Sequence, residues 1–105
     1  MVAVKWDARG LVPAVVQDAG TGQVLMLAYM NKEAWEKTLA TGKATYYSRS
    51  RQVLWHKGET SGNIIKVVEI RRDCENNSLL VKARPTGPVC HTGNKNCYFR
   101  QLDED

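Results

Sequence analysis

Three cysteines are the residues of this sequence best suited to carry chemistry. Cys74, Cys90 and Cys97 are separated by sixteen and seven positions, and neither spacing matches the short gap of zinc fingers and ribbons. Their odd number excludes a complete set of disulfides within the chain, and thiols in a reducing compartment serve as metal ligands, nucleophiles or buried apolar residues. Three thiolates with a fourth position open to water would form a catalytic zinc site.

A zinc ion held by three thiolates needs a neighbouring base. The charge of the thiolates makes the bound water less acidic than three imidazoles would. His91, next to Cys90, is the first candidate for this base, and Glu59 is the second. Alternatively, His91 is a fourth zinc ligand or an ordinary loop residue. A nucleophilic pair of Cys90 and His91 is a third option, although sequence neighbours seldom face each other closely enough for it.

Oxygen-bearing side chains alternate around the first cysteine. Asp73, Glu75 and Asn77 occupy positions i, i+2 and i+4, so on an extended chain they would share one face while Cys74 points to the other. Carboxylate oxygens, with waters and substrate phosphates, are the ligands that Mg²⁺ prefers. The alternative is that these residues only form the turn of a hairpin.

Two polar segments precede this region. The run from Ser48 to Arg51 combines two hydroxyls with two guanidinium groups, which suits phosphate binding, although a solvated turn has the same composition. The segment from Trp55 to Asn63 holds two glycines, a lysine, an acid and two hydroxyls. A turn that only reverses the chain does not need so many polar and charged side chains, so we expect a functional loop.

Short strands around one helix should position these groups. Apolar runs at 11–18 and 24–30 flank a turn-rich segment and predict a hairpin. Further strands are predicted at 44–49, 53–56, 64–74, 78–83 and 97–102. Gly87, Pro88 and Gly93 predict that the segment 86–97 is a shaped loop.

One substantial helix is expected at about 32–41, between Asn31 as N-cap and Gly42 as C-terminal stop. Trp35 and Leu39 are four residues apart and should face the core together. The fold class is therefore α+β and mainly β, with short antiparallel strands in two sheets or a pseudo-barrel.

Length and composition limit the possible functions. The 105 residues form a single domain, 1–105, of ordinary globular composition, with 43% hydrophobic and 25% charged residues. The N-terminus has no signal architecture and no run is long enough to span a membrane, so we expect a cytoplasmic protein. A net charge of +4 without charge runs suits a small anionic substrate better than a nucleic acid.

Several motifs together resemble the phosphoribosyl-AMP cyclohydrolase family of histidine biosynthesis. They are the segment from Trp55 to Asn63, the pair Asp73-Cys74, and the segment from Thr86 to Gly93 with Cys97. The resemblance extends from about Gly10 to Phe99. It implies a hydrolase that opens the adenine ring of 1-(5-phosphoribosyl)-AMP at the N1–C6 bond.

The resemblance also implies metals and a partner. Zinc would be held by Cys74 of one chain and by Cys90 and Cys97 of the other, in an intertwined homodimer. Magnesium would lie at Asp73, Glu75 and Asn77, where the family motif Asp-Cys-Asp-x-Asp reads Asp-Cys-Glu-Asn-Asn in this chain. The site carries two carboxylates instead of three, so we expect weaker magnesium binding.

A substrate with two phosphates would explain the cations of the polar segments. The expected substrate-binding residues are Ser48, Arg49, Arg51, Trp55, Lys57, Gly58, Ser61 and Gly62. A different class of protein is the runner-up: a small RNA-binding module stabilised by a closed zinc site of Cys74, Cys90, Cys97 and His91. No membrane or nucleic-acid partner is expected for the enzyme.

Overall fold

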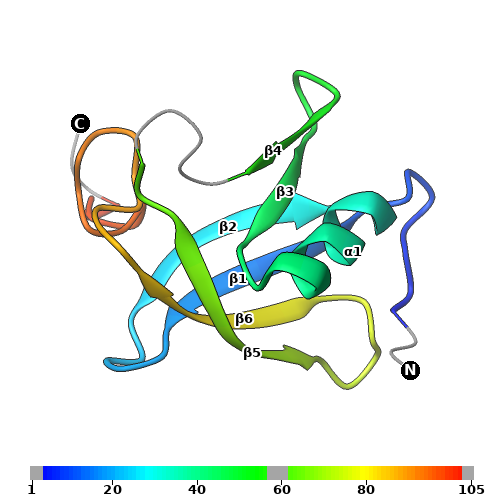
Figure 1. The fold of residues 1–105 in the computed structure, drawn as a ribbon, viewed down its shortest axis with the longest axis horizontal. Coiled ribbons are helices and arrows are strands. Elements are labelled where there is room, and N and C mark those ends of the chain that lie inside the picture. Colours follow the sequence, from blue (N-terminus) through cyan, green and yellow to red (C-terminus); the bar gives the residue numbers. More distant parts are fainter. Residues whose placement is uncertain (1–3, 57–61, 103–105) are drawn as a thin grey trace.

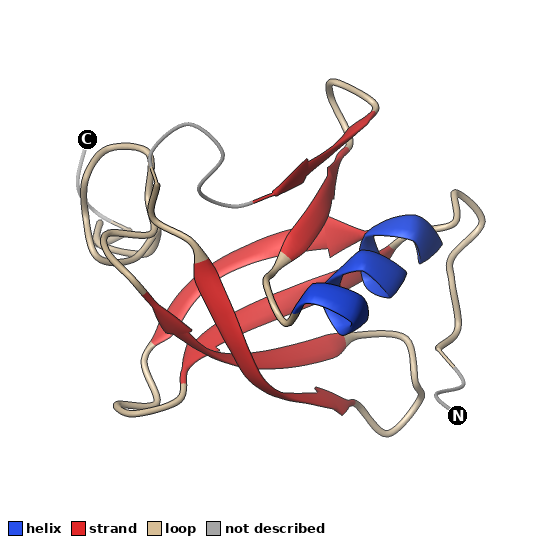
Figure 2. Cartoon of the chain, viewed as in Figure 1, coloured by secondary structure: helices blue, strands red, loops and turns tan. Residues whose placement is uncertain are grey.

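The chain folds around a four-stranded sheet, with a helix and a short hairpin on one side of it (Figures 1 and 2). The structure is a computed structural model that describes residues 4–56 and 62–102. Within these residues the elements, in chain order, are β1 Val12–Asp18, β2 Val24–Met30, α1 Lys32–Thr41, β3 Thr45–Ser48, β4 Val53–His56, β5 Ile65–Arg72 and β6 Leu79–Pro85. The expected mainly β, α+β class with two sheets and one helix is confirmed, without a closed barrel.

The order of strands in the large sheet is β2-β1-β6-β5. The β1–β2 and β5–β6 hairpins are antiparallel, as expected, but the central β1–β6 pair is parallel. Our expectation of antiparallel strands throughout was wrong at this pair. A long connection separates β1 from β6, so no tight turn constrains their direction.

Alternating apolar residues of the two central strands form the core. Val12, Ala14 and Val16 of β1 are completely buried, and so are Val81 and Ala83 of β6. The residues between them are half-buried on the other face of the sheet, as the two-residue period of a strand requires. The central pair β1–β6 is therefore buried in the core, and each of its strands pairs with one outer strand, β2 or β5.

The helix begins and ends where the sequence predicts. The Asn31 side chain accepts a hydrogen bond from the Ala34 amide at 2.8 Å, and Gly42 adopts a left-handed conformation with φ of 71°. Trp35 is buried, but Leu39 is 55% exposed, so the expected pairing of the two was wrong. Thr38 faces inward instead, and its hydroxyl accepts a hydrogen bond from the Thr45 amide at 3.0 Å.

Two expected strand segments are irregular. No strand forms at 97–102: the Cys97 amide donates to the Leu25 carbonyl at 2.7 Å, but the next amide, that of Tyr98, is bound by the Asn96 side chain. That side-chain bond removes the donor a ladder would need. Strand β5 ends at Arg72, so Cys74 lies in the turn that follows.

No helix among the described residues is long and apolar enough to cross a membrane.

Tyr46 offers a test of the core packing. Its ring is buried and lies 5.1 Å from that of Trp55, and burial raises the pKa of the phenol. Among the described residues its hydroxyl has no hydrogen-bond partner, which is an unfavourable arrangement. Tyr46→Phe should therefore keep or raise the free energy of unfolding, by up to about 1 kcal/mol.

Urea denaturation at one fixed protein concentration measures this change. The matched variant Tyr46→Leu, which also loses the ring, should be less stable than Tyr46→Phe by about 1–3 kcal/mol. A loss of more than 1 kcal/mol in Tyr46→Phe would show that the hydroxyl has a partner, and would contradict this packing.

Candidate functional site

The loop after β6 is a compact ring that presents two of the three cysteines. The Gly93 amide donates to the Cys90 carbonyl at 2.9 Å, and the Cys90 amide donates to the Asn94 carbonyl at 3.1 Å. Gly93 has a φ of 91°, which only glycine adopts without strain, so the turn depends on it. Val89 is buried in the main core and anchors the ring, which confirms the shaped loop predicted from the sequence (Figure 1).

Cys90 lies on the inner side of this ring. Its sulfur is largely buried and accepts a hydrogen bond from the Thr92 hydroxyl, with 3.1 Å between Oγ1 and Sγ. The Thr92 hydroxyl in turn accepts from the Asn94 side-chain amide at 2.9 Å, which orients it. His91 is exposed on the same loop. The loop therefore holds one sulfur in a fixed place, and the next residue in the sequence carries an accessible imidazole.

The loop after β6 also contacts the polar segment 55–63 of the sequence, at Asn63. Gly87 packs directly against the Asn63 side chain, so closely that any Cβ at this position would overlap its amide group. Thr86 donates to the Ile64 carbonyl through its amide, at 3.0 Å. The two polar segments, distant in sequence, therefore meet at one end of the sheet.

Cys74 lies at the opposite end. Strand β6 runs from the turn that holds Cys74 to the loop that holds Cys90, and its seven residues span about 23 Å (Figure 1). Two sulfurs on one zinc ion are about 4 Å apart. Within the described part of the chain, no three His, Cys, Asp or Glu side chains gather around a possible metal position. A single chain therefore does not bring the three thiols together.

The turn between β5 and β6 holds the residues expected to bind magnesium. They lie in a tight turn, which is the alternative that the sequence left open, and not on an extended chain that would place Asp73, Glu75 and Asn77 on one face. Desolvation raises the pKa of the Asp73 carboxyl group, but hydrogen bonds donated mainly by Asn77 and Ser78 lower it by more, so the pKa lies below its ordinary value. All three side chains are exposed.

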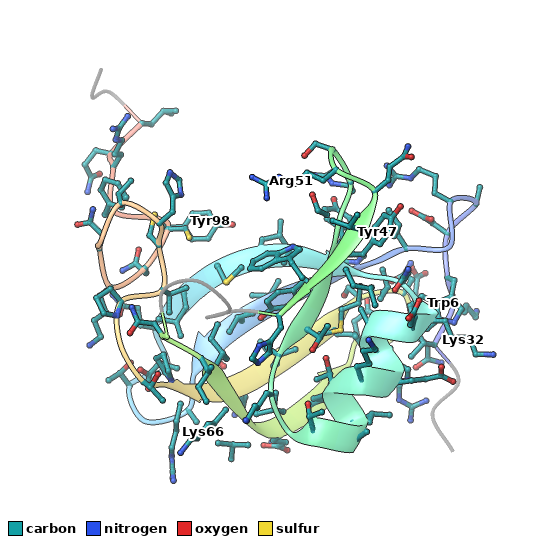
Figure 3. All side chains as sticks on the ribbon, turned by 45° about the horizontal axis from the view of Figure 1, so that its top comes forward. Trp6, Lys32, Tyr47, Arg51, Lys66 and Tyr98 are labelled. Atoms are coloured by element: carbon teal, nitrogen blue, oxygen red, sulfur yellow. The ribbon has the colours of Figure 1, made fainter. Side chains whose placement is uncertain are left out.

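The serine and arginine cluster closes the β3–β4 hairpin. The Ser48 hydroxyl accepts a hydrogen bond from the Arg51 amide at 3.2 Å, which is a turn-forming contact. The Arg49 guanidinium carbon lies 4.0 Å from the centroid of the Tyr29 ring, a distance typical of cation–π stacking. In Figure 3 the Arg51 side chain extends away from the helix, toward the side of the molecule on which Tyr98 lies. Both guanidinium groups remain exposed and able to meet an anion.

A pocket of about 400 Å³ lies between the end of α1 and the β3–β4 hairpin. It is lined by Lys37, Thr41, Lys43, Thr45, Leu54, Trp55 and His56. The sequence singled out Trp55 here but missed Lys37 and Lys43, because the helix and the hairpin meet only in the folded chain. Two ammonium groups beside an indole and an imidazole suit a ligand that carries both phosphate and an aromatic ring.

The remaining expected site residues are only partly placed. Lys57, Gly58, Glu59 and Ser61 lie outside the described residues. Gly62 is exposed and has a φ of 79°, in the left-handed region.

Comparison with known proteins identifies the family. The family model described as phosphoribosyl-AMP cyclohydrolase matches residues 26–99, a stretch that includes all three cysteines, the pocket and the C-terminal loop. The chain belongs to the phosphoribosyl-AMP cyclohydrolase family. The resemblance drawn from the sequence motifs and the assignment as an enzyme are both confirmed.

Relatives cover almost all of the chain. A phosphoribosyl-AMP cyclohydrolase of Pelotomaculum thermopropionicum is 55% identical over 103 residues, which are 98% of this chain and 80% of that protein. One of Alkalilimnicola ehrlichii is 50% identical over 105 residues, 100% of this chain and 74% of that protein. The histidine biosynthesis bifunctional protein HisIE of Bacillus subtilis is 54% identical over 102 residues, 97% of this chain and 49% of that longer protein.

The burial of the three thiols predicts their reactivity. Cys74 and Cys97 are exposed and Cys90 is buried, and all three are thiols rather than a disulfide. In zinc-free native protein, two thiols per chain should react quickly with a chromogenic disulfide reagent, and the third at least about tenfold more slowly. Cys74→Ser should leave one fast thiol and Cys90→Ser should leave two. Three equally fast thiols in the folded wild-type protein would contradict this placement.

Proposed function

We propose that this chain hydrolyses 1-(5-phosphoribosyl)-AMP at the N1–C6 bond of its adenine ring, the third step of histidine biosynthesis. The relatives named phosphoribosyl-AMP cyclohydrolase, and the bifunctional relative named for histidine biosynthesis, support the reaction. The observation that carries the proposal is the position of the thiols: two lie on one loop, and the third lies at the far end of β6.

The three thiols suit a zinc ion shared between two chains. Zinc favours thiolate ligands in tetrahedral geometry, and a site with three protein ligands leaves one position for water. In this proposal, Cys90 and Cys97 of one chain bind the ion together with Cys74 of a second copy. Bound zinc would supply a water molecule of lowered pKa next to the substrate.

A second copy has surfaces on which to pack. Val24 and Leu27 of the edge strand β2 are 44% and 45% exposed, and Val68 of the other edge strand, β5, is 52% exposed. In this proposal a second copy covers these exposed apolar side chains. A small domain gains stability from such burial, which supports a homodimer. We place this homodimer in the cytoplasm, as its pathway and composition suggest.

Residues of the chain itself would perform the remaining steps. Water adds to C6 while the N1–C6 bond breaks, so that the oxygen stays on C6 as the carboxamide and N1 ends with a proton. The N1 ribosyl group makes the ring a cationic amidine, and C6 is therefore more electrophilic than in adenosine. The exposed His91 imidazole takes the proton from the attacking water, and Glu59 is the second candidate for this role. Thr92 holds the Cys90 sulfur in place through its hydroxyl.

Cations on two elements would bind the two phosphates. Arg49 and Arg51 of the β3–β4 turn lie at one side, and Lys37 and Lys43 line the pocket beside Trp55. In this proposal, Lys57 and the backbone amides of the segment from Gly58 to Gly62 add further hydrogen-bond donors. Among residues 4–56 and 62–102, no ion pair is found for Arg49, Arg51, Lys37 and Lys43, so an anionic ligand need not displace a carboxylate of these residues.

The geometry argues against the RNA-binding module. That reading requires Cys74, Cys90, Cys97 and His91 to close one site in one chain, but Cys74 lies a whole strand length away from the other three. The enzyme reading needs only that a second copy supplies Cys74.

A turnover assay tests the proposed function. Purified zinc-loaded protein should consume phosphoribosyl-AMP, followed by its absorbance, and chelation should slow turnover at least about a hundredfold. Readdition of zinc should restore the rate, and the chelated protein should stay largely folded by circular dichroism. Absence of turnover in the zinc-loaded protein would overturn the assignment.

Cys97→Ala should abolish turnover and lower the zinc content, because one thiolate ligand is lost. Lys32→Ala, at an exposed position of α1, is the matched control and should keep both the rate and the zinc (Figure 3). Full activity with one zinc per chain in Cys97→Ala would exclude Cys97 as a ligand.

A further inference from the structure

The turn between β5 and β6 is closed by its first residue, Asp73. Asp73 Oδ1 accepts hydrogen bonds from the amides of Asn77 and Ser78, at 2.9 and 3.3 Å. The backbone adds two bonds, from the Asp73 amide to the Ser78 carbonyl and from the Asn76 amide to the Asp73 carbonyl, both at 3.1 Å. Cys74 is the second residue of this turn, so whatever fixes the turn also fixes its sulfur.

The Asn77 side chain completes the closure. With its nitrogen facing Asp73, the amide donates to Oδ2 at 2.7 Å and lies 3.2 Å from Oδ1. The opposite orientation would place an amide oxygen against a carboxylate, which is favourable only with a cation between them, so without a cation the hydrogen-bond network favours the nitrogen on this side. In that orientation both oxygens of the Asp73 carboxylate accept N–H donors from the turn itself.

This arrangement does not fit a magnesium ion. Mg²⁺ prefers charged oxygen ligands in a near-octahedral arrangement, whereas this turn offers two carboxylates and a neutral amide that can instead donate its own N–H to Asp73. No group of three acidic, cysteine or histidine side chains converges here among the described residues. The negative charge of Asp73 is already solvated by amide donors, so the turn does not need a cation to balance it.

We propose that Asn77 is a positioning residue. Its side-chain amide closes the turn by donating to the Asp73 carboxylate, in the place of a divalent cation bound to that carboxylate. The turn and Cys74 therefore keep their positions without Mg²⁺. The inference rests on the proposed function only for the role of Cys74 as a zinc ligand. The magnesium-independence of the turn itself stands on the contacts of Asp73 and Asn77 alone.

Asn77→Asp tests this inference, because it removes the N–H donor and places a second carboxylate against Asp73. The melting temperature and the zinc affinity, measured by competition with a chelating dye, are recorded with and without millimolar Mg²⁺. Without Mg²⁺ the variant should melt about 4 °C lower and bind zinc about tenfold more weakly than wild type. Mg²⁺ should restore most of both losses, and should leave both values of the wild-type protein unchanged.

Two further variants complete the test. Asn31→Asp makes the same chemical change at the N-cap of α1, where a carboxylate accepts equally well, and should behave like wild type. Asn77→Ala removes the donor without adding charge, so it should lose stability and zinc affinity that Mg²⁺ does not restore. The melting temperature and zinc affinity of Asn77→Ala also test the inference if Asn77→Asp does not fold.

Three results would overturn the inference: a wild-type melting temperature that Mg²⁺ raises as much as that of Asn77→Asp, an Asn77→Asp protein unchanged without Mg²⁺, or an unchanged Asn77→Ala protein. If the wild-type protein binds no zinc, the proposed function fails instead, and the melting temperatures still decide whether Asn77 replaces a cation.

Discussion

The pairing of β6 with β1 is the constraint on which the rest of this structure depends. It buries the central core, and it holds β6 in the middle of the sheet between the turn with Cys74 and the loop with Cys90. A strand of seven residues spans about 23 Å, far more than two ligands of one metal ion allow. A single chain built in this way does not bring the three thiols to one metal ion, and for this reason we propose that Cys74 comes from a second copy.

Local hydrogen bonds organise each end of β6, and at the loop after β6 the buried Val89 adds an anchor in the core. At one end, the Thr92 hydroxyl holds the Cys90 sulfur, and Gly87 permits close packing against Asn63. At the other end, Asp73 accepts hydrogen bonds from the turn that follows it. These contacts fix each half of the proposed site before the two halves meet, so that little ordering would remain to be done on assembly. The sheet sets the distance between the two ends of β6, and the local hydrogen bonds at each end position the cysteine there.

Local signals in the sequence predicted most of the elements. The helix bounds followed from Asn31 and Gly42, because capping depends on neighbouring residues only. Leu39 was misplaced because the helix packs through Thr38, whose hydroxyl bonds to the backbone of β3, a contact the hydropathy pattern does not contain. The parallel β1–β6 pair and the pocket lysines depend on contacts between distant segments. The site residues taken from the motifs stay a prediction, whereas the separation of Cys74 from Cys90 follows only from the length and direction of β6.

The most direct test of the shared site is complementation between two inactive chains. In a mixed dimer of Cys74→Ala and Cys97→Ala chains, one of the two sites has all three wild-type cysteines, and random pairing makes half of the dimers mixed. The account predicts that an equimolar mixture, refolded together, recovers about one quarter of the wild-type rate. A mixture of Cys90→Ala and Cys97→Ala should recover no activity. Each site takes both Cys90 and Cys97 from one chain, so every site in a mixed dimer still lacks one of them. If the first mixture stays inactive although mass spectrometry detects mixed dimers, the claim that Cys74 comes from the second chain is contradicted.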